Sequence, residues 1–213
     1  MWAALKSPLL LGNDLRDMDA KTLSIINNPA IIAINQDPRG RAVQRVVRNF
    51  AVPKDQFGVG ETHIWTGPLA NGDQILVFLN VADEEMNMAA TLEEVFITDG
   101  VGGTAPQIQQ DWVIFDLWGS RMSEKDAQNV LDSKTQKGRQ KILHSLNWYN
   151  ATETPYAKGL EVRDERLFGK KIGSVSARGK IEALVPRHAA KVFRLQSVGG
   201  QDTTRKSLLK DEL

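Results

Sequence analysis

The sequence predicts a mainly β protein in which a short β/α segment precedes an antiparallel β sandwich. Two observations support this fold class. Within the first 40 residues, the unalternating apolar run Leu9–Leu11 is followed by apolar residues at helical spacing, which is typical of an alternating β/α architecture. After residue 41, short runs rich in β-branched and aromatic residues recur about every ten residues between glycine-marked turns, which is typical of a sandwich or barrel.

The opening segment is predicted to contain a helix end, a strand and a helix. Residues Trp2–Lys6 have the composition of the end of a helix, and the proline that follows stops it because proline lacks a backbone donor. The run Leu9–Leu11 predicts a strand buried on both faces, as in a parallel sheet. The next helix has Asp17 or Asp19 as its N-cap. Pro29 breaks this helix, and a second apolar run follows.

The strands of the sandwich are predicted from runs that contain β-branched and aromatic residues. They are expected at residues 43–52, 61–66, 74–81, 86–92, 112–118, 172–176, 180–185 and 189–195. The pair Asn71-Gly72 predicts a hairpin turn, and residues 86–92 are predicted to return along the central strand at 74–81. Residues Thr91–Glu94 resemble a capping box that opens a helical turn.

The region between residues 118 and 172 gives weaker signals. A surface helical turn is predicted at Ser123–Leu131, which begins with a serine. The basic stretch Lys134–Lys141 is interpreted as a solvated loop, because it contains a glycine and little apolar content. At the other end of the chain, residues 197–213 begin glycine-rich and polar and are predicted to form a flexible tail.

The composition argues against several classes of function. The 27 basic and 26 acidic residues give a net charge of +1, and the basic residues are scattered, so no nucleic-acid surface is predicted. No run approaches the ~18 apolar residues that a membrane span needs. The chain has no cysteine, which excludes disulfides and thiolate metal sites.

No metal or cofactor site is predicted. His63, His144 and His188 are far apart, and none has a second ligand at the spacing of a metal site. The aspartates between Asp14 and Asp19 lack the glycine and the distant glutamate of a calcium loop, so capping and electrostatic roles are preferred.

The last four residues predict a cellular address. A carboxyl-terminal Lys-Asp-Glu-Leu is read by the endoplasmic-reticulum retrieval receptor, and the chain ends Lys210, Asp211, Glu212, Leu213. This address acts only on proteins of the secretory pathway, yet the amino terminus carries no signal-peptide pattern. We therefore expect further residues upstream of Met1 and a location in the endoplasmic-reticulum lumen. In that compartment Asn150, within the sequon Asn150-Ala151-Thr152, is a candidate glycosylation site.

Several stretches resemble a known family. SPLLLGNDLRDM and IAINQDPRG, between residues 7 and 40, resemble the last strand and last helix of the catalytic barrel of the melibiase-type α-galactosidases, which are retaining glycoside hydrolases. DWVIFDLWGSR at residues 111–121 and YNATETPYAKGLEVRDERLFGKKIGSVS at residues 149–176 resemble the carboxyl-terminal β domain of the yeast and fungal members. The resemblance implies that residues 1–40 end an incomplete (β/α)8 barrel and that residues 41–196 form the sandwich.

The resemblance also implies a reaction, the hydrolysis of terminal α-linked galactose from galactosides with retention of configuration and without a cofactor. Such an enzyme needs two carboxyl groups about 5–5.5 Å apart. In this family both are aspartates on earlier barrel strands, and their motifs do not occur here. We therefore expect the nucleophile and the acid/base upstream of Met1 and no activity from this chain alone. Asp14 and Arg16, in the NDLR stretch, are expected to form a hydrogen-bonded pair beneath the site.

An alternative interpretation is a non-catalytic β-sandwich module that packs beside a barrel or binds carbohydrate weakly through exposed aromatic residues. The candidate side chains are Trp65, Trp112, Trp118 and Trp148, and a place in the core is the competing role for each of them. The oligomeric state is not predicted by the sequence.

The apolar residues of the opening segment predict a solubility problem. Trp2 and Leu9–Leu11 would be buried against barrel strands that this chain lacks, and their exposure creates an aggregation-prone surface and an open strand edge. We expect the chain to be poorly soluble unless the residues before Arg41 are removed.

Overall fold

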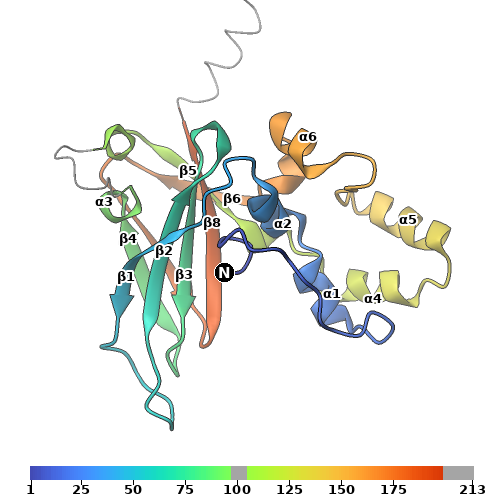
Figure 1. The fold of residues 1–213 in the computed structure, drawn as a ribbon, viewed down its shortest axis with the longest axis horizontal. Helices are drawn as coiled ribbons and strands as arrows, with labels where there is room; N and C mark the ends of the chain where they lie inside the picture. The colour runs from blue at the N-terminus through green and yellow to red at the C-terminus, as the bar shows by residue number, and fades with distance from the viewer. Residues whose placement is uncertain (97–104, 199–213) are drawn as a thin grey trace, which may run out of the picture.

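The computed structural model describes residues 1–96 and 105–198, which form two β-sheets with a layer of helices on one side (Figure 1). The larger sheet has the strand order β1-β2-β3-β8-β5-β6 with antiparallel neighbours, and the smaller sheet pairs β4 with β7. The strands are β1 (Gln44–Asn49), β2 (Thr62–Pro68), β3 (Gln74–Asn80), β4 (Met86–Thr91), β5 (Trp112–Asp116), β6 (Lys170–Val175), β7 (Lys180–Val185) and β8 (Ala189–Ser197). The predicted antiparallel sandwich is therefore confirmed.

The helices of the described residues lie mainly beside the larger sheet, and α3 alone lies near β4 (Figure 1). The α-helices are α1 (Ala20–Ile26), α2 (Pro29–Gln36), α3 (Leu92–Val95), α4 (Glu124–Asp132), α5 (Gln136–Ser145) and α6 (Tyr156–Glu161). Short 3-10 turns are η1 (Ala70–Gly72), η2 (Pro106–Gln109), η3 (Leu117–Ser120) and η4 (Glu165–Leu167). None of the helices among these residues has the length and apolar character to cross a membrane.

Strand β3 lies between β2 and β8 in the larger sheet, and both of its faces are buried. Leu76 and Phe78 point into the core between the two sheets, where the Phe78 ring meets the Phe193 ring edge-on at 5.8 Å between centroids. Ile75 and Val77 point to the opposite face and pack against α2. This pattern explains why the strand reads as a continuous apolar run, since alternate side chains enter two different cores.

The fourth strand does not return along β3, so that predicted pairing is wrong. β4 pairs with β7, with Met86 opposite Val185, and joins the second sheet. The buried side chain of Asn80 lies at the switch point. Its amide nitrogen is 2.8 Å from the carbonyl oxygen of Glu84 and 3.0 Å from that of Val185, which connects the end of β3 to the end of β7.

Replacing Asn80 with alanine is expected to lower the free energy of unfolding by about 2–3 kcal/mol, because buried carbonyl groups lose their donor. Chemical unfolding in urea measures the change. The matched control is Asn49→Ala, which removes an exposed hydrogen bond to the amide of Ala51 and is expected to change stability by less than about 0.5 kcal/mol. Equal effects of the two substitutions would show that Asn80 does not hold the crossover.

The helix termini follow their sequence signals. Asp19 caps α1 by accepting from the amide of Thr22, and Ser123 caps α4, as the sequence predicts. Thr91 and Glu94 form the predicted capping box of α3. Pro29, predicted to break a helix, occupies the first turn of α2, where proline fits because that amide has no partner within the helix.

Two expectations about the helical side are wrong. Leu9–Leu11 form no strand, because a strand in a parallel sheet needs neighbours for its backbone groups and none of the described residues supplies them. Most of the basic stretch Lys134–Lys141, predicted as a loop, belongs to α5, which Thr135 caps by accepting from the amide of Gly138. No residue of α5 is buried, so its solvated character is as predicted although its secondary structure is not.

Candidate functional site

The residues before α2 form an apolar hollow with a volume of about 360 Å³. Trp2 and Leu9–Leu11 lie on its outer side, and Ile75, Trp118 and Val192 of the sandwich lie on its inner side. Of its lining residues, Asn13 supplies the one side-chain amide. Sugar sites need several convergent polar groups to orient hydroxyls, so this hollow is suited to receive apolar side chains of a polypeptide.

The segment before α2 leaves large apolar side chains in solvent, of which Leu10 and Leu11 also line the hollow. The exposed fractions are 71% for Leu10, 64% for Leu15 and 57% for Leu11. A contiguous exposed group of leucines marks an interaction surface in a soluble protein. The predicted exposure of apolar side chains in the opening segment is therefore present in the structure. We call residues 2–15 together with Ile25 the apolar rim.

Asp14 and Arg16 form a bidentate ion pair at the edge of this rim. Arg16 donates from Nε to Asp14 Oδ1 at 3.0 Å and from Nη2 to Asp14 Oδ2 at 2.8 Å. The Arg16 guanidinium holds the pKa of the Asp14 carboxyl below its ordinary value. Both side chains are exposed, Arg16 at 91% and Asp14 at 49%, so in this chain the pair organises a local loop, and its place beneath a catalytic site stays a prediction.

The buried carboxylates of the described residues are Asp37 and Asp73, and both face Arg194. Arg194 donates from Nε to Asp73 Oδ2 at 2.7 Å, and its Nη2 lies 3.9 Å from Asp37 Oδ2. Phe168 lies over the Arg194 guanidinium, 4.1 Å from its ring centroid to the guanidinium carbon. We call Asp37, Asp73 and Arg194 the buried charge cluster. Asp73 is hydrogen-bonded to the cation and Asp37 lies within ion-pair distance of it, which indicates a structural role for the cluster.

Sequence reasoning missed this cluster, although one signal was present. Arg194 interrupts the run Val192–Leu195, in which the neighbouring side chains are apolar and buried. A charged residue at a core position of a central strand requires a buried partner. Nothing in local sequence spacing links Asp37 to a strand more than 150 residues later.

The tryptophans do not form an exposed binding platform. Trp112 is fully buried, stacks on Phe96 at 4.8 Å between ring centroids and donates from Nε1 to the carbonyl of Gln107. Trp118 is half-buried and donates to the carbonyl of Ala190. Trp65 and Trp148 are half-buried as well. The exposed-aromatic prediction is wrong for Trp112, and a core or boundary role fits all four.

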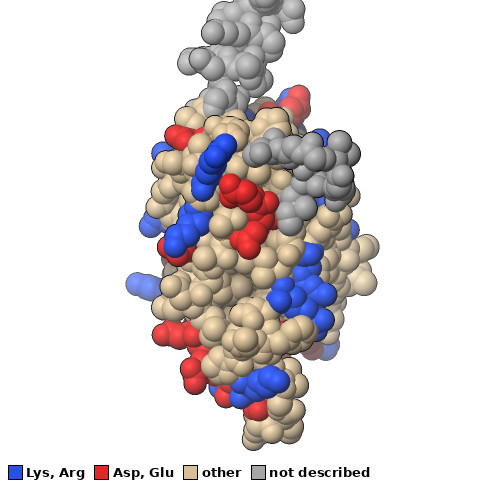
Figure 2. All heavy atoms as spheres, turned by 90° about the vertical axis from the view of Figure 1, so that its left-hand side faces the viewer, with Lys and Arg blue, Asp and Glu red and all other residues tan. Residues whose placement is uncertain are grey.

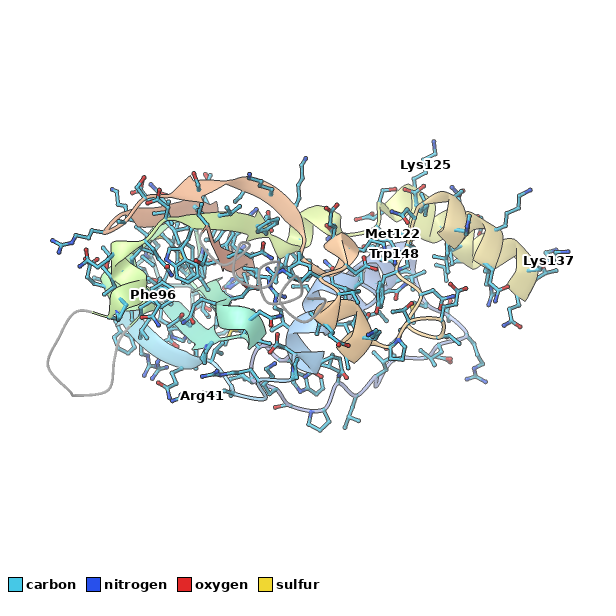
Figure 3. All side chains as sticks on the ribbon, turned by 90° about the horizontal axis from the view of Figure 1, so that it is seen from above. Arg41, Phe96, Met122, Lys125, Lys137 and Trp148 are labelled. Carbon is cyan, nitrogen blue, oxygen red and sulfur yellow. The ribbon has the colours of Figure 1, made fainter. Side chains whose placement is uncertain are left out.

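Asn150 lies in the segment between α5 and α6. Its side-chain amide donates to Glu153 Oε1 at 2.8 Å, and its carbonyl oxygen accepts from the amide of Thr152 at 3.1 Å. Figure 3 shows Lys125 of α4 and Lys137 of α5 pointing away from the rest of the molecule. The predicted retrieval signal, Lys210–Leu213, lies outside the described residues.

The charged surface offers no second site on the face that Figure 2 shows. Basic and acidic side chains lie there in small separate groups among uncharged residues. Nucleic-acid recognition requires a continuous basic surface. Across residues 1–96 and 105–198, no group of three or more His, Cys, Asp or Glu side chains is placed to hold a metal ion.

Comparison with known proteins gives two family matches. Residues 1–37 match the family described as alpha galactosidase A, and residues 59–139 match the alpha galactosidase C-terminal beta sandwich domain. Among curated relatives, an alpha-galactosidase of Saccharomyces mikatae is 38% identical over 196 residues, which are 92% of this chain and 40% of that protein. Alpha-galactosidase 5 of Saccharomyces cerevisiae is 40% identical over the same shares of the two chains.

Solved structures give the same relationship. The α-galactosidase of Saccharomyces cerevisiae, determined with raffinose, superposes with a TM-score of 0.82 at 38% identity, over 92% of this chain and 41% of that chain. α-Galactosidase I of Mortierella vinacea, at 24% identity and a TM-score of 0.55, shares the fold. The chain thus spans about 40% of the length of the curated relatives it matches, and within that span it is similar to the melibiase-type α-galactosidases.

Proposed function

We propose that this chain is the carboxyl-terminal part of an enzyme that hydrolyses terminal α-galactosides with retention of configuration. In that enzyme the sandwich would flank a (β/α)8 barrel, and residues before α2 would complete the barrel. The observation that carries this proposal is the apolar rim, whose exposed leucines lie in the segment that matches the catalytic family. Barrel strands packed on this rim would bury those leucines, and each buried leucine contributes about 1.5–3 kcal/mol.

A galactoside is the substrate class that the relatives support. Their names state α-galactosidase activity, and one was solved with raffinose. Retention requires a nucleophile and an acid/base, and within residues 1–96 and 105–198 both buried carboxylates face Arg194. The role we assign to the chain is therefore to support the barrel and close it, while the two reacting carboxyl groups come from outside residues 1–213.

This assignment makes the isolated chain inactive. A chromogenic α-galactoside incubated with the purified 213-residue chain is expected to release no chromophore above the rate in buffer. Alpha-galactosidase 5 of Saccharomyces cerevisiae serves as the positive control. Release that scales with the concentration of the chain would contradict the assignment and would require a carboxylate pair within these residues.

The cellular address and the glycan are further parts of this proposal. The terminal Lys-Asp-Glu-Leu supports retrieval to the endoplasmic-reticulum lumen by its receptor. A secreted reporter that carries residues 197–213 is expected to stay inside the cell, and one lacking the last four residues to leave it. For Asn150, endoglycosidase treatment of the chain made in secretory cells behind an added signal peptide is expected to increase its gel mobility, and Asn150→Gln is expected to abolish that shift. Equal secretion, or no shift, would overturn the respective part.

A further inference from the structure

Helix α2 matches the α-galactosidase A family in sequence but packs against the sandwich. Its residues fall in the stretch that matches the catalytic family, which ends at residue 37. Yet its side chains are buried in the sandwich. Ala30 and Ile34 pack against Ile75 and Val77 of the larger sheet, and Ala33 packs in the cluster formed with α6 and η4. Figure 1 shows α2 between the sheet and α6.

The amino end of α2 is attached to the sandwich by its own cap residue. Asn28 is fully buried, and its Oδ1 accepts from the amide of Ala30 at 3.0 Å, as an N-cap does. Its Nδ2 donates to the carbonyl oxygen of Leu117 at 3.0 Å, on the turn that follows β5. Serine and aspartate cap helices as well as asparagine does, but neither can donate a second hydrogen bond from an amide group.

The carboxyl end is attached in the same way. Asp37 is the C-cap of α2, and its Oδ1 accepts from the amide of Ala70 at 2.9 Å, in the turn between β2 and β3. Its Oδ2 faces Nη2 of Arg194 at 3.9 Å. Arg194 is 1% exposed, on β8. Removing α2 from the sheet would therefore leave this guanidinium with one of its two buried carboxylates.

Residues 7–26 are attached to α2 less extensively than the sandwich is. Asn35 of α2 donates from Nδ2 to the Ser7 carbonyl at 2.7 Å, and the neighbouring Lys6 donates to the carbonyls of Ile34 and Asp37. Ser24 is the one buried residue of α1, and Leu10 and Leu15 are exposed. The N-cap of α1, Asp19, bonds only within its own turn, to the amide and hydroxyl of Thr22. The cap of α1 therefore serves only its own helix, whereas the caps of α2 also join that helix to the sandwich.

We propose that Asn28 and Asp37 form a joint that makes α2 part of the cooperative unit of the sandwich, so that the sandwich sets the position of this helix independently of residues 7–26. The joint consists of these two caps and their partners, the Leu117 carbonyl, the Ala70 amide and Arg194. It requires no catalytic activity and is testable in the chain itself. If the proposed function is also correct, the sandwich positions the last helix of the barrel.

Native-state amide hydrogen exchange of the 213-residue chain, read by mass spectrometry, tests the joint. In the unmodified chain the amides of α2 are expected to exchange as slowly as those of β3, and the amides of α1 at least about tenfold faster, because protection follows the cooperative unit. Exchange of α2 at the rate of α1 would overturn the proposal.

The decisive variant is Asn28→Asp. Aspartate keeps the capping acceptor and places a negative charge at the helix amino end, so a solvent-exposed cap that serves α2 alone would give unchanged or increased protection of α2. The joint predicts the opposite, because the donor to the Leu117 carbonyl is lost. We expect α2 protection to fall at least about tenfold further than that of β3. An equal fall in both, or no fall, contradicts the joint.

A second variant and a control complete the test. Asp37→Asn keeps the size of the side chain and removes the charge that faces Arg194, and it is expected to give the same selective loss in α2. Asp19→Ala removes the cap of α1 and is expected to speed exchange in α1 alone. Loss of α2 protection in Asp19→Ala would show that α2 depends on the segment before it, which the joint excludes.

Discussion

Replacing Arg194 with methionine is expected to lower the free energy of unfolding by about 3–5 kcal/mol, because the substitution leaves buried charges without their partner. Its Nε lies 2.7 Å from Asp73 Oδ2, and both side chains are almost completely excluded from solvent. Arg163, whose Nη2 lies 3.5 Å from the same oxygen, is more exposed and replaces only part of the lost interaction. Urea unfolding followed by circular dichroism measures the change.

The pH dependence gives a second readout of the same substitution. Burial raises the pKa of Asp73 even with Arg194 beside it. The folded state therefore binds this proton more tightly than the unfolded state does, and the stability that Asp73 contributes is complete below the unfolded pKa and is lost as the pH rises through the folded pKa. Without Arg194 the pKa rises further, so the deficit of Arg194→Met is expected to be smaller near pH 4 than near pH 7.

The matched control for this prediction is Arg16→Met. Arg16 also pairs with an aspartate, but in full contact with solvent, and exposed pairs contribute little to stability. We expect no measurable change from this substitution. A loss at Arg194 as small as that at Arg16 would mean that the buried charge cluster does not hold the helix layer to the sheet.

Removal of residues 1–40 is the second change with a large expected effect, and it reverses the prediction made from sequence. The sequence predicted that trimming before Arg41 would improve solubility. In the structure that cut also removes α2. The loss of the buried Ile34 side chain lowers the free energy of unfolding by about 1.5–3 kcal/mol, and Arg194 loses its contact with Asp37. Against a total stability of about 5–15 kcal/mol for a typical domain, we expect residues 41–213 to be largely unfolded and to aggregate.

The matched alternative leaves α2 in place. The double substitution Leu10→Glu and Leu11→Glu adds charge to the apolar rim, where both side chains are exposed, and is expected to give a monodisperse chain in light scattering. The unmodified chain should associate at the same concentration. If residues 41–213 were monodisperse and unfolded cooperatively, α2 would be dispensable to the sandwich. That result would contradict the expected unfolding of residues 41–213 and the proposed joint at α2.

The strands and helix caps were predictable because their signals are local. Asp19 and Ser123 each directly precede a helix, and their side chains accept from amides of its first turn that have no partner within the helix. The capping box at Thr91–Glu94 is complete within four residues. The sandwich followed from the spacing of the strands, although not their pairing. β4 pairs with β7, at whose end Asn80 donates to the carbonyl of Val185, a residue distant in sequence, and no local pattern encodes such a contact.

The missed features have physical reasons of the same kind. Helix α5 buries no side chain, so its sequence lacks the apolar stripe that predicts a helix. The sequence signal that remains is the N-cap residue Thr135. Leu9–Leu11 have the composition of a buried strand, but a strand forms only where neighbouring strands satisfy its backbone. The buried charge cluster joins Asp37, Asp73 and Arg194 from three separate parts of the chain, and only the fold brings them together.

A chimaera tests the central claim most directly. This chain would replace the matching carboxyl-terminal two fifths of alpha-galactosidase 5 of Saccharomyces cerevisiae, with which it shares 40% identity. If the chain closes and supports an α-galactosidase barrel, the chimaera is expected to hydrolyse a chromogenic α-galactoside, and Leu10→Glu with Leu11→Glu is expected to abolish that activity while the isolated chain stays folded. A folded, soluble chimaera without activity, or activity that both glutamates leave unchanged, would contradict the claim.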